Sequence, residues 1–170
     1  GISPDLKAND SGLSSISVYL LSNLIIFNYA TIYAASHDSI AAPMSFKLTH
    51  PEYDAFINYA ASLNLEYKSA TQKKMDELIE TAKKELYYKK SELEIQNLEN
   101  SLKHNMKDDL NYFRDEVKNL LETEIVKRFY YRKGAILKNL SNSESIKLGI
   151  ETLNDQNKLT TGRLYGRSLL

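Results

Sequence analysis

The sequence predicts an all-α protein, and two observations support this prediction. Apolar residues recur at helical spacing over long stretches, and lysine and glutamate occupy the positions between them. Ser or Thr followed three positions later by Glu or Gln marks helix starts at Thr49–Glu52, Ser69–Gln72 and Ser141–Glu144. We expect a long antiparallel helical hairpin with an apolar N-terminal helical segment and short flanking helices.

The composition limits the classes of function. The chain has 170 residues, 42% of them hydrophobic, which is enough for a packed core. Its 22 basic residues balance 22 acidic ones, so no overall charge attracts the chain to nucleic acid, and we expect no nucleic-acid partner. Cysteine is absent, which excludes disulfides, a thiolate zinc site and a cysteine nucleophile.

The N-terminal part differs from the rest in charge. Residues 1–70 carry nine charged side chains, and the other 35 lie in residues 71–170. Residues 1–12 are rich in turn formers and predict an extended lead-in. The chain starts at Gly1 without an initiator Met or a signal-peptide pattern, so we expect it to be a piece of a longer protein.

Residues 13–45 are predicted to form an apolar helical segment followed by a loop. The run Val18–Ala35 has no charged residue and approaches the length of about 20 residues that a membrane span needs. Interrupting Ser and Asn residues, recurrent tyrosines and the lack of a flanking Lys/Arg cluster favour one or two buried helices instead. A membrane anchor is therefore a disfavoured alternative.

Residues 46–155 are predicted to form the hairpin domain. A short helix should follow Thr49, and a long helix should run from Gln72 to about Lys103, with a drift in the phase of its apolar stripe midway. After a turn at His104–Asn105, a second long helix should lie antiparallel to the first. Its apolar stripe is Leu110, Phe113, Val117, Leu120, Leu121 and Ile125.

Three further predictions concern the C-terminal part of the chain. Gly134 should either interrupt the second helix or allow a close approach to its backbone. A short last helix after Ser141 should turn Ile146, Ile150 and Leu153 inward. Residues 156–170 have no apolar period, and we expect a loosely ordered tail.

The search for catalytic or metal-binding patterns gives no candidate. Three histidines lie far apart in the sequence, and no Glu-x-x-His pair occurs. Neither a Gly-x-Ser-x-Gly elbow nor a glycine-rich phosphate loop is present. We expect the acidic residues of the long helices to be exposed to solvent. These residues are Glu92, Glu94, Glu99, Glu122 and Glu124. We therefore expect no catalytic residue, metal ligand or cofactor.

One local cluster, residues 124–134, interleaves basic and aromatic side chains. It could bind a nucleic-acid strand by stacking and charge, or a peptide carboxylate through Arg128 or Arg132. Three successive aromatic residues on a helix point in three directions, which favours a mainly structural role. A protein-contact surface formed by Arg128, Tyr130, Tyr131 and Arg132 is the second hypothesis.

Several blocks resemble a known family in their order and spacing. GISPD at residues 1–5 resembles the segment that closes the protease core in S41 (carboxyl-terminal processing) serine peptidases. The blocks at residues 13–43, 46–60 and 120–136 resemble the C-terminal helical region of Bacteroides-like members, and they read LSSISVYLLSNLIIFNYATIYAASHDSIAAP, FKLTHPEYDAFINYA and LLETEIVKRFYYRKGAI.

The resemblance implies a context for this chain. The family is exported to the cell envelope and uses a Ser/Lys dyad and a PDZ module, but no residue here matches either of these. It implies a non-catalytic helical domain that follows a protease core, with assembly, core-covering or substrate-holding roles. Implied partners are the upstream core, protein or peptide substrates and a second copy, and the implied location is the Gram-negative periplasm. The alternative is a free-standing interaction module unrelated to proteolysis.

Overall fold

The computed structural model describes residues 12–102 and 105–155, and these residues form helices, turns and loops without a strand. The predicted all-α class is confirmed. The helices in chain order are α1 (Ser15–Ser22), α2 (Ile25–Ala35), α3 (His50–Ser62), α4 (Ala70–Lys84), the 3₁₀ turn η1 (Tyr88–Lys90), α5 (Glu92–Leu102), α6 (Met106–Tyr112), α7 (Arg114–Asn142) and α8 (Glu144–Asn154). Residues 1–11 and 156–170, predicted as lead-in and tail, lie outside the described residues.

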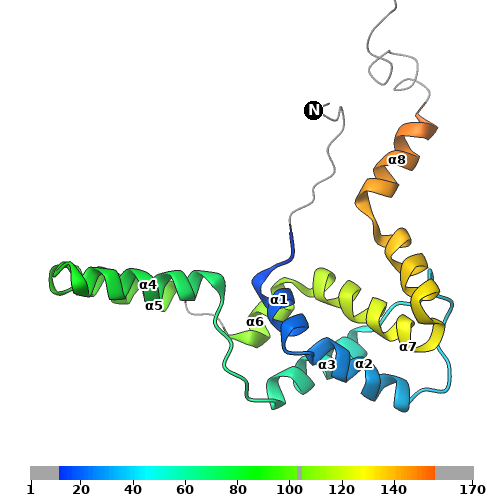
Figure 1. Ribbon diagram of the computed structural model, residues 1–170, viewed down its shortest axis with the longest axis horizontal. Helices are drawn as coiled ribbons and strands as arrows, with labels where there is room; N and C mark the ends of the chain where they lie inside the picture. Colours follow the sequence, from blue (N-terminus) through cyan, green and yellow to red (C-terminus); the bar gives the residue numbers. More distant parts are fainter. Residues whose placement is uncertain (1–11, 103–104, 156–170) are drawn as a thin grey trace, which may run out of the picture.

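One hydrophobic core lies between α1, α2, α3, α6 and the first part of α7 (Figure 1). The contact between α2 and α7 is the most extensive in the described chain. Most of the second predicted stripe is confirmed as core, because Leu110, Val117, Leu121 and Ile125 are fully buried. Residues on both sides of position 45 contribute to this core, and the division of the chain at that position remains a prediction.

The uncharged N-terminal segment forms two helices. The helical conformation is interrupted at Asn23–Leu24, where Leu24 has a left-handed backbone with φ of 56°. No single helix of the described residues is both long and apolar enough to cross a membrane. Only α1 and α2 taken together reach that length and hydropathy, and they are bent by 65°. Ile16, Leu20 and Ala30 from this pair are buried in the core.

The predicted pairing of two long helices is wrong. The first of them folds back on itself after Lys84, where Leu86 has φ of 64°, so α4 and α5 are antiparallel neighbours. These two helices and η1 form an arm that projects from the core (Figure 1). Only Met75 of the arm is buried. The shift in phase of the apolar stripe, midway along the predicted first long helix, marks the position of this turn.

Local capping chemistry fixes the starts of three helices, α3, α4 and α6, as predicted. Thr49 and Ser69 each form a complete capping box, with Glu52 and Gln72 as the reciprocal partners. Asn105 caps α6, and Asp108 lies in its first turn as expected. The capping box predicted at Ser141 is wrong, because α7 continues to Asn142 and Ser143 caps α8 instead.

The last helix lies outside the core. Ile146, Ile150 and Leu153 were expected to face inward, and they are 37%, 54% and 69% exposed. The helix contacts only α7 extensively, and it extends from the end of α7 away from the other helices (Figure 1). Its apolar side therefore lacks a neighbour among the described residues.

Replacement of Leu121 by Asp tests the assignment of the core. Leu121 is fully buried in the core cluster, and an unpaired buried charge costs several kcal/mol, on the order of the whole stability of a small domain. We expect loss of the cooperative thermal transition followed by circular dichroism. Leu140→Asp is the matched control, since Leu140 lies on the same helix and is 45% exposed; equal melting temperatures for the two variants would contradict the assignment.

Candidate functional site

A groove on the surface of the core is the first candidate site. It has a volume of about 500 Å³ and runs between the corner of α1 and α2 and both parts of α7. Its apolar lining comes from Leu13, Leu21, Leu24, Phe27 and Leu120. Asn139 and Asn142 from the end of α7 complete one wall. Glu116, Glu124 and Lys127 also line the groove, which therefore combines apolar side chains with charged and amide groups.

Arg128 forms one edge of this region and connects α7 to α2. Its guanidinium donates to the Phe27 carbonyl at 3.2 Å and to the Thr31 hydroxyl at 3.2 Å. It also lies over the Phe27 ring at 4.2 Å and pairs with Glu124 at 2.6 Å. Arg128, proposed from sequence as a protein-contact residue, is thus engaged within the chain.

The other three residues of the predicted contact surface lie at different places. The Tyr130 hydroxyl donates to the Ile40 carbonyl at 3.0 Å, which attaches the loop after α2 to α7. Tyr131 is 79% exposed, and Arg132 is exposed as well. A contact surface formed by all four residues remains a prediction, and Tyr131 and Arg132 are exposed while Tyr130 is 37% exposed.

A buried ion pair joins the two parts of α7, and the sequence did not predict it. Glu122 was expected to be solvated, but it is fully buried, and so is Lys138, at an Nζ–Oε2 distance of 2.7 Å. The Glu122 carboxylate accepts from the Leu48 amide at 2.9 Å, and the Lys138 ammonium donates to the Phe46 carbonyl. The only signal in the sequence was the apolar pair Leu120–Leu121 before Glu122 and the pair Ile125–Val126 three and four positions after it.

The ion pair holds the segment 46–48 between the two parts of α7. Phe46 and Leu48 are buried, whereas Lys47 points outward and lies 3.5 Å from Glu122. Burial lowers the pKa of the Lys138 ammonium, and the hydrogen bond to Glu122 opposes that shift. A buried charge pair of this kind is retained only with its remaining hydrogen bonds satisfied, and the backbone of segment 46–48 supplies two of them.

A kink in α7 brings Glu122 and Lys138 together. Tyr131 has φ of 54° and ψ of −158° inside the helix, a conformation that side-chain-bearing residues rarely adopt. Gly134 follows the kink, and a Cβ atom there would lie 2.3 Å from Tyr130 Cβ and 3.1 Å from Val126 Cγ1. The prediction of a close approach at Gly134 is confirmed. The interruption itself falls at Tyr131.

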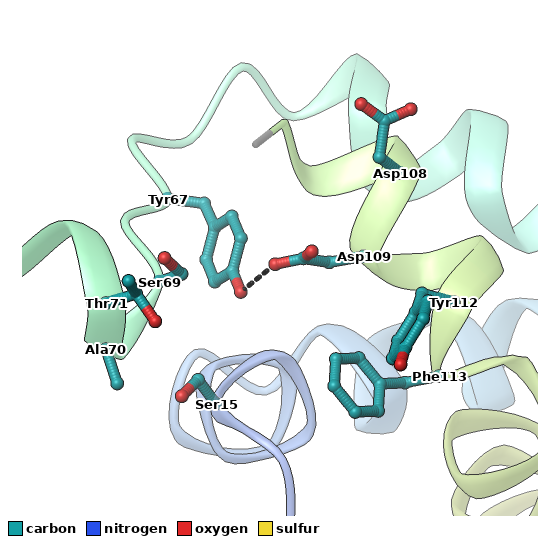
Figure 2. A pocket seen from close by; sticks show the side chains of 9 residues that line it. All are labelled: Ser15, Tyr67, Ser69, Ala70, Thr71, Asp108, Asp109, Tyr112 and Phe113. Atoms are coloured by element: carbon teal, nitrogen blue, oxygen red, sulfur yellow. Dashed lines mark hydrogen bonds between the residues drawn. The ribbon is translucent and has the colours of Figure 1, made fainter. Parts of the chain in front are cut away.

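A second recess, of about 500 Å³, lies at the base of the arm. Figure 2 shows the Tyr67 hydroxyl pointing at Asp109, to which it donates at 2.5 Å. Burial and this carboxylate both raise the pKa of Tyr67, so the phenol stays protonated at neutral pH. Ser69, Tyr112 and Phe113 also line the recess. The Tyr67–Asp109 bond joins the segment before the arm to α6.

Metal-binding geometry does not occur in the part of the chain that the structure describes. No group of three or more His, Cys, Asp or Glu side chains there could hold a metal ion. His37 stacks on Tyr33 at a ring distance of 3.9 Å, and His50 begins α3. His104 lies outside the described residues.

Arg128 and Arg132 form a matched pair that tests the connection between α2 and α7. Arg128→Ala removes charged hydrogen bonds and a cation–π contact, so we expect a loss of about 1–3 kcal/mol in the free energy of unfolding in urea. Arg132→Ala changes an exposed side chain, and we expect a change of at most about 0.5 kcal/mol. Equal losses in the two variants would show that the Arg128 contacts add no stability.

Comparison with known proteins gives one match. Neither the curated proteins nor the solved structures contain a match to this chain. Residues 16–153 match the model of a family described as "Probable PDZ-protease, C-terminal helical domain". The match starts in α1 and ends in α8, so it includes the core, the arm, the groove and the kinked helix. The chain therefore belongs to the family of C-terminal helical domains of probable PDZ-proteases.

Proposed function

We propose that this chain is the non-catalytic C-terminal helical domain of an S41-type serine endopeptidase and that it covers the protease core. A C-terminal domain of a protease is attached to a protease core, and the family therefore supports such a partner. The resemblance of GISPD at residues 1–5 to the segment that closes S41 cores supports the S41 type. Export to the periplasm of a Gram-negative bacterium is part of the same proposal.

The observation that carries the covering role is the groove between α1, α2 and α7. Leu21 and Leu24 are 40% and 57% exposed at its floor, and no charged residue occurs from Ser11 to Ser36. Apolar side chains with charged and polar side chains beside them are typical of a protein–protein interface. A protease core attached to the same chain is present at high effective concentration, so even a modest contact area suffices.

The same proposal includes two secondary roles, substrate holding and assembly. The arm exposes Leu78 and Leu98, which suits the holding of substrate or assembly with a second copy. A free-standing interaction module unrelated to proteolysis is the alternative, and the family match argues against it. The sequence encoded directly upstream separates these possibilities, because our proposal requires a PDZ module and a Ser/Lys protease core there.

The isolated chain should not hydrolyse proteins. Because the sequence has no Gly-x-Ser-x-Gly elbow and no residue that matches the Ser/Lys dyad of the S41 family, incubation with casein or with peptides that end in apolar residues should release no fragments in a mass-spectrometric assay. The complete protease serves as the positive control. Hydrolysis that persists after repurification of the chain would contradict the non-catalytic assignment.

Charge in the groove should weaken the contact with the protease core. Leu21→Asp with Leu24→Asp places two carboxylates at the apolar floor, and Asp tolerates the left-handed backbone of Leu24. In the complete protease we expect a lower melting temperature and faster proteolytic nicking between core and domain, because the desolvation cost of the carboxylates opposes docking.

The control for this experiment is Leu86→Asp at the tip of the arm, where the side chain is 86% exposed. The isolated domain should melt at the same temperature with and without the groove substitutions. If the groove substitutions leave the melting temperature and the nicking rate of the complete protease unchanged, the result would argue against core covering and would leave the family assignment intact.

A further inference from the structure

We propose that α7 is a two-state hinge at Tyr131. In the bent state the Glu122–Lys138 ion pair joins the two parts of the helix. In the straight state α7 is one continuous helix, the segment 46–48 is released, and α8 moves with the end of α7. This inference uses the geometry of the chain alone and does not depend on the protease proposal.

The bent state has a backbone cost at Tyr131. Its φ of 54° and ψ of −158° lie in a region that is essentially limited to glycine. Residues 124–142 contain no proline and one glycine, so nothing in the local sequence breaks a helix at this point. A straight helix is therefore the conformation that local preferences favour, and non-local contacts must maintain the bend.

The ion pair is the contact that maintains it. In a continuous helix, the Cα atoms of residues sixteen positions apart are separated by about 24 Å, which is far beyond the reach of a Glu–Lys pair. The observed Nζ–Oε2 distance of 2.7 Å therefore exists only in the bent state. Thr123 donates to the Asn139 side chain at 3.1 Å and depends on the bend for the same reason.

Gly134 is part of the same hinge. A Cβ atom at this position would lie 2.3 Å from Tyr130 Cβ in the bent state, so any larger residue opposes the bend. A continuous helix accommodates alanine well and favours it over glycine by about 1 kcal/mol. Tyr131 and Gly134 thus respond in opposite ways to substitution: glycine at 131 favours the bent state and alanine at 134 favours the straight one.

The hinge has a consequence for the groove. Asn139 and Asn142 form one of its walls, and both lie beyond the kink. Straightening of α7 removes this wall and also frees the backbone groups of Phe46 and Leu48 from Lys138 and Glu122. The state of the hinge therefore decides whether the groove is complete.

Distance measurement between two spin labels tests the hinge in the full 170-residue chain. The chain has no cysteine, so Asp115→Cys and Leu140→Cys, both at exposed positions of α7, label only these sites. A straight helix separates them by about 38 Å, and the bent state gives a much shorter distance. In the otherwise unchanged protein we expect the short distance to predominate.

Four variants of the labelled chain decide the question. Gly134→Ala and Lys138→Met should each add a population near about 38 Å. Tyr131→Gly should keep the short distance alone, and Tyr131→Gly combined with Lys138→Met should lose most of the long-distance population that Lys138→Met produces. Circular dichroism of every variant separates straightening, which retains helical signal, from unfolding, which loses it.

The outcome depends on two variants. The hinge is supported if Gly134→Ala or Lys138→Met shows the long distance with its helical signal retained. It is overturned if neither variant does so, whether they keep the short distance or unfold. Gly134→Ala leaves both charged side chains in place, so its result does not depend on tolerance of an unpaired buried carboxylate.

Discussion

The packing of α2 against α7 is the contact on which the other elements depend. The segment from Ser11 to Ser36 has no charged residue, so its helices need an apolar neighbour, and the stripe of α7 with Val117, Leu121 and Ile125 provides it. Arg128 adds polar bonds and a ring contact at the edge of the same interface. Once α2 is held there, α3 and α6 close the remaining sides of the core.

The kink in α7 adds a second level of organisation to this core. It allows one helix to contribute apolar residues from its first part and a buried cation from its second part. The segment 46–48 fills the space between them, with Phe46 and Leu48 buried and its backbone bonded to Glu122 and Lys138. A buried ion pair contributes little net stability relative to apolar residues of the same size.

Membership in the protease-associated family gives these features a common context. The described residues form the α2–α7 core, a partly apolar groove on its surface, and the projecting arm and α8 (Figure 1). The arm has a single buried side chain, Met75, so its surface is available to a neighbour.

Local interactions in the sequence determined the all-α class and the starts of α3, α4 and α6, because a cap such as Thr49 with Glu52 involves residues three positions apart. The sequence also identified Leu110, Val117, Leu121 and Ile125 as core. Only the tertiary structure decided that the first long helix folds back near Leu86, that Glu122 is buried with Lys138, and that α7 bends at Tyr131. These features depend on contacts between residues far apart in the chain, and helical periodicity carries no information about which apolar surface meets which.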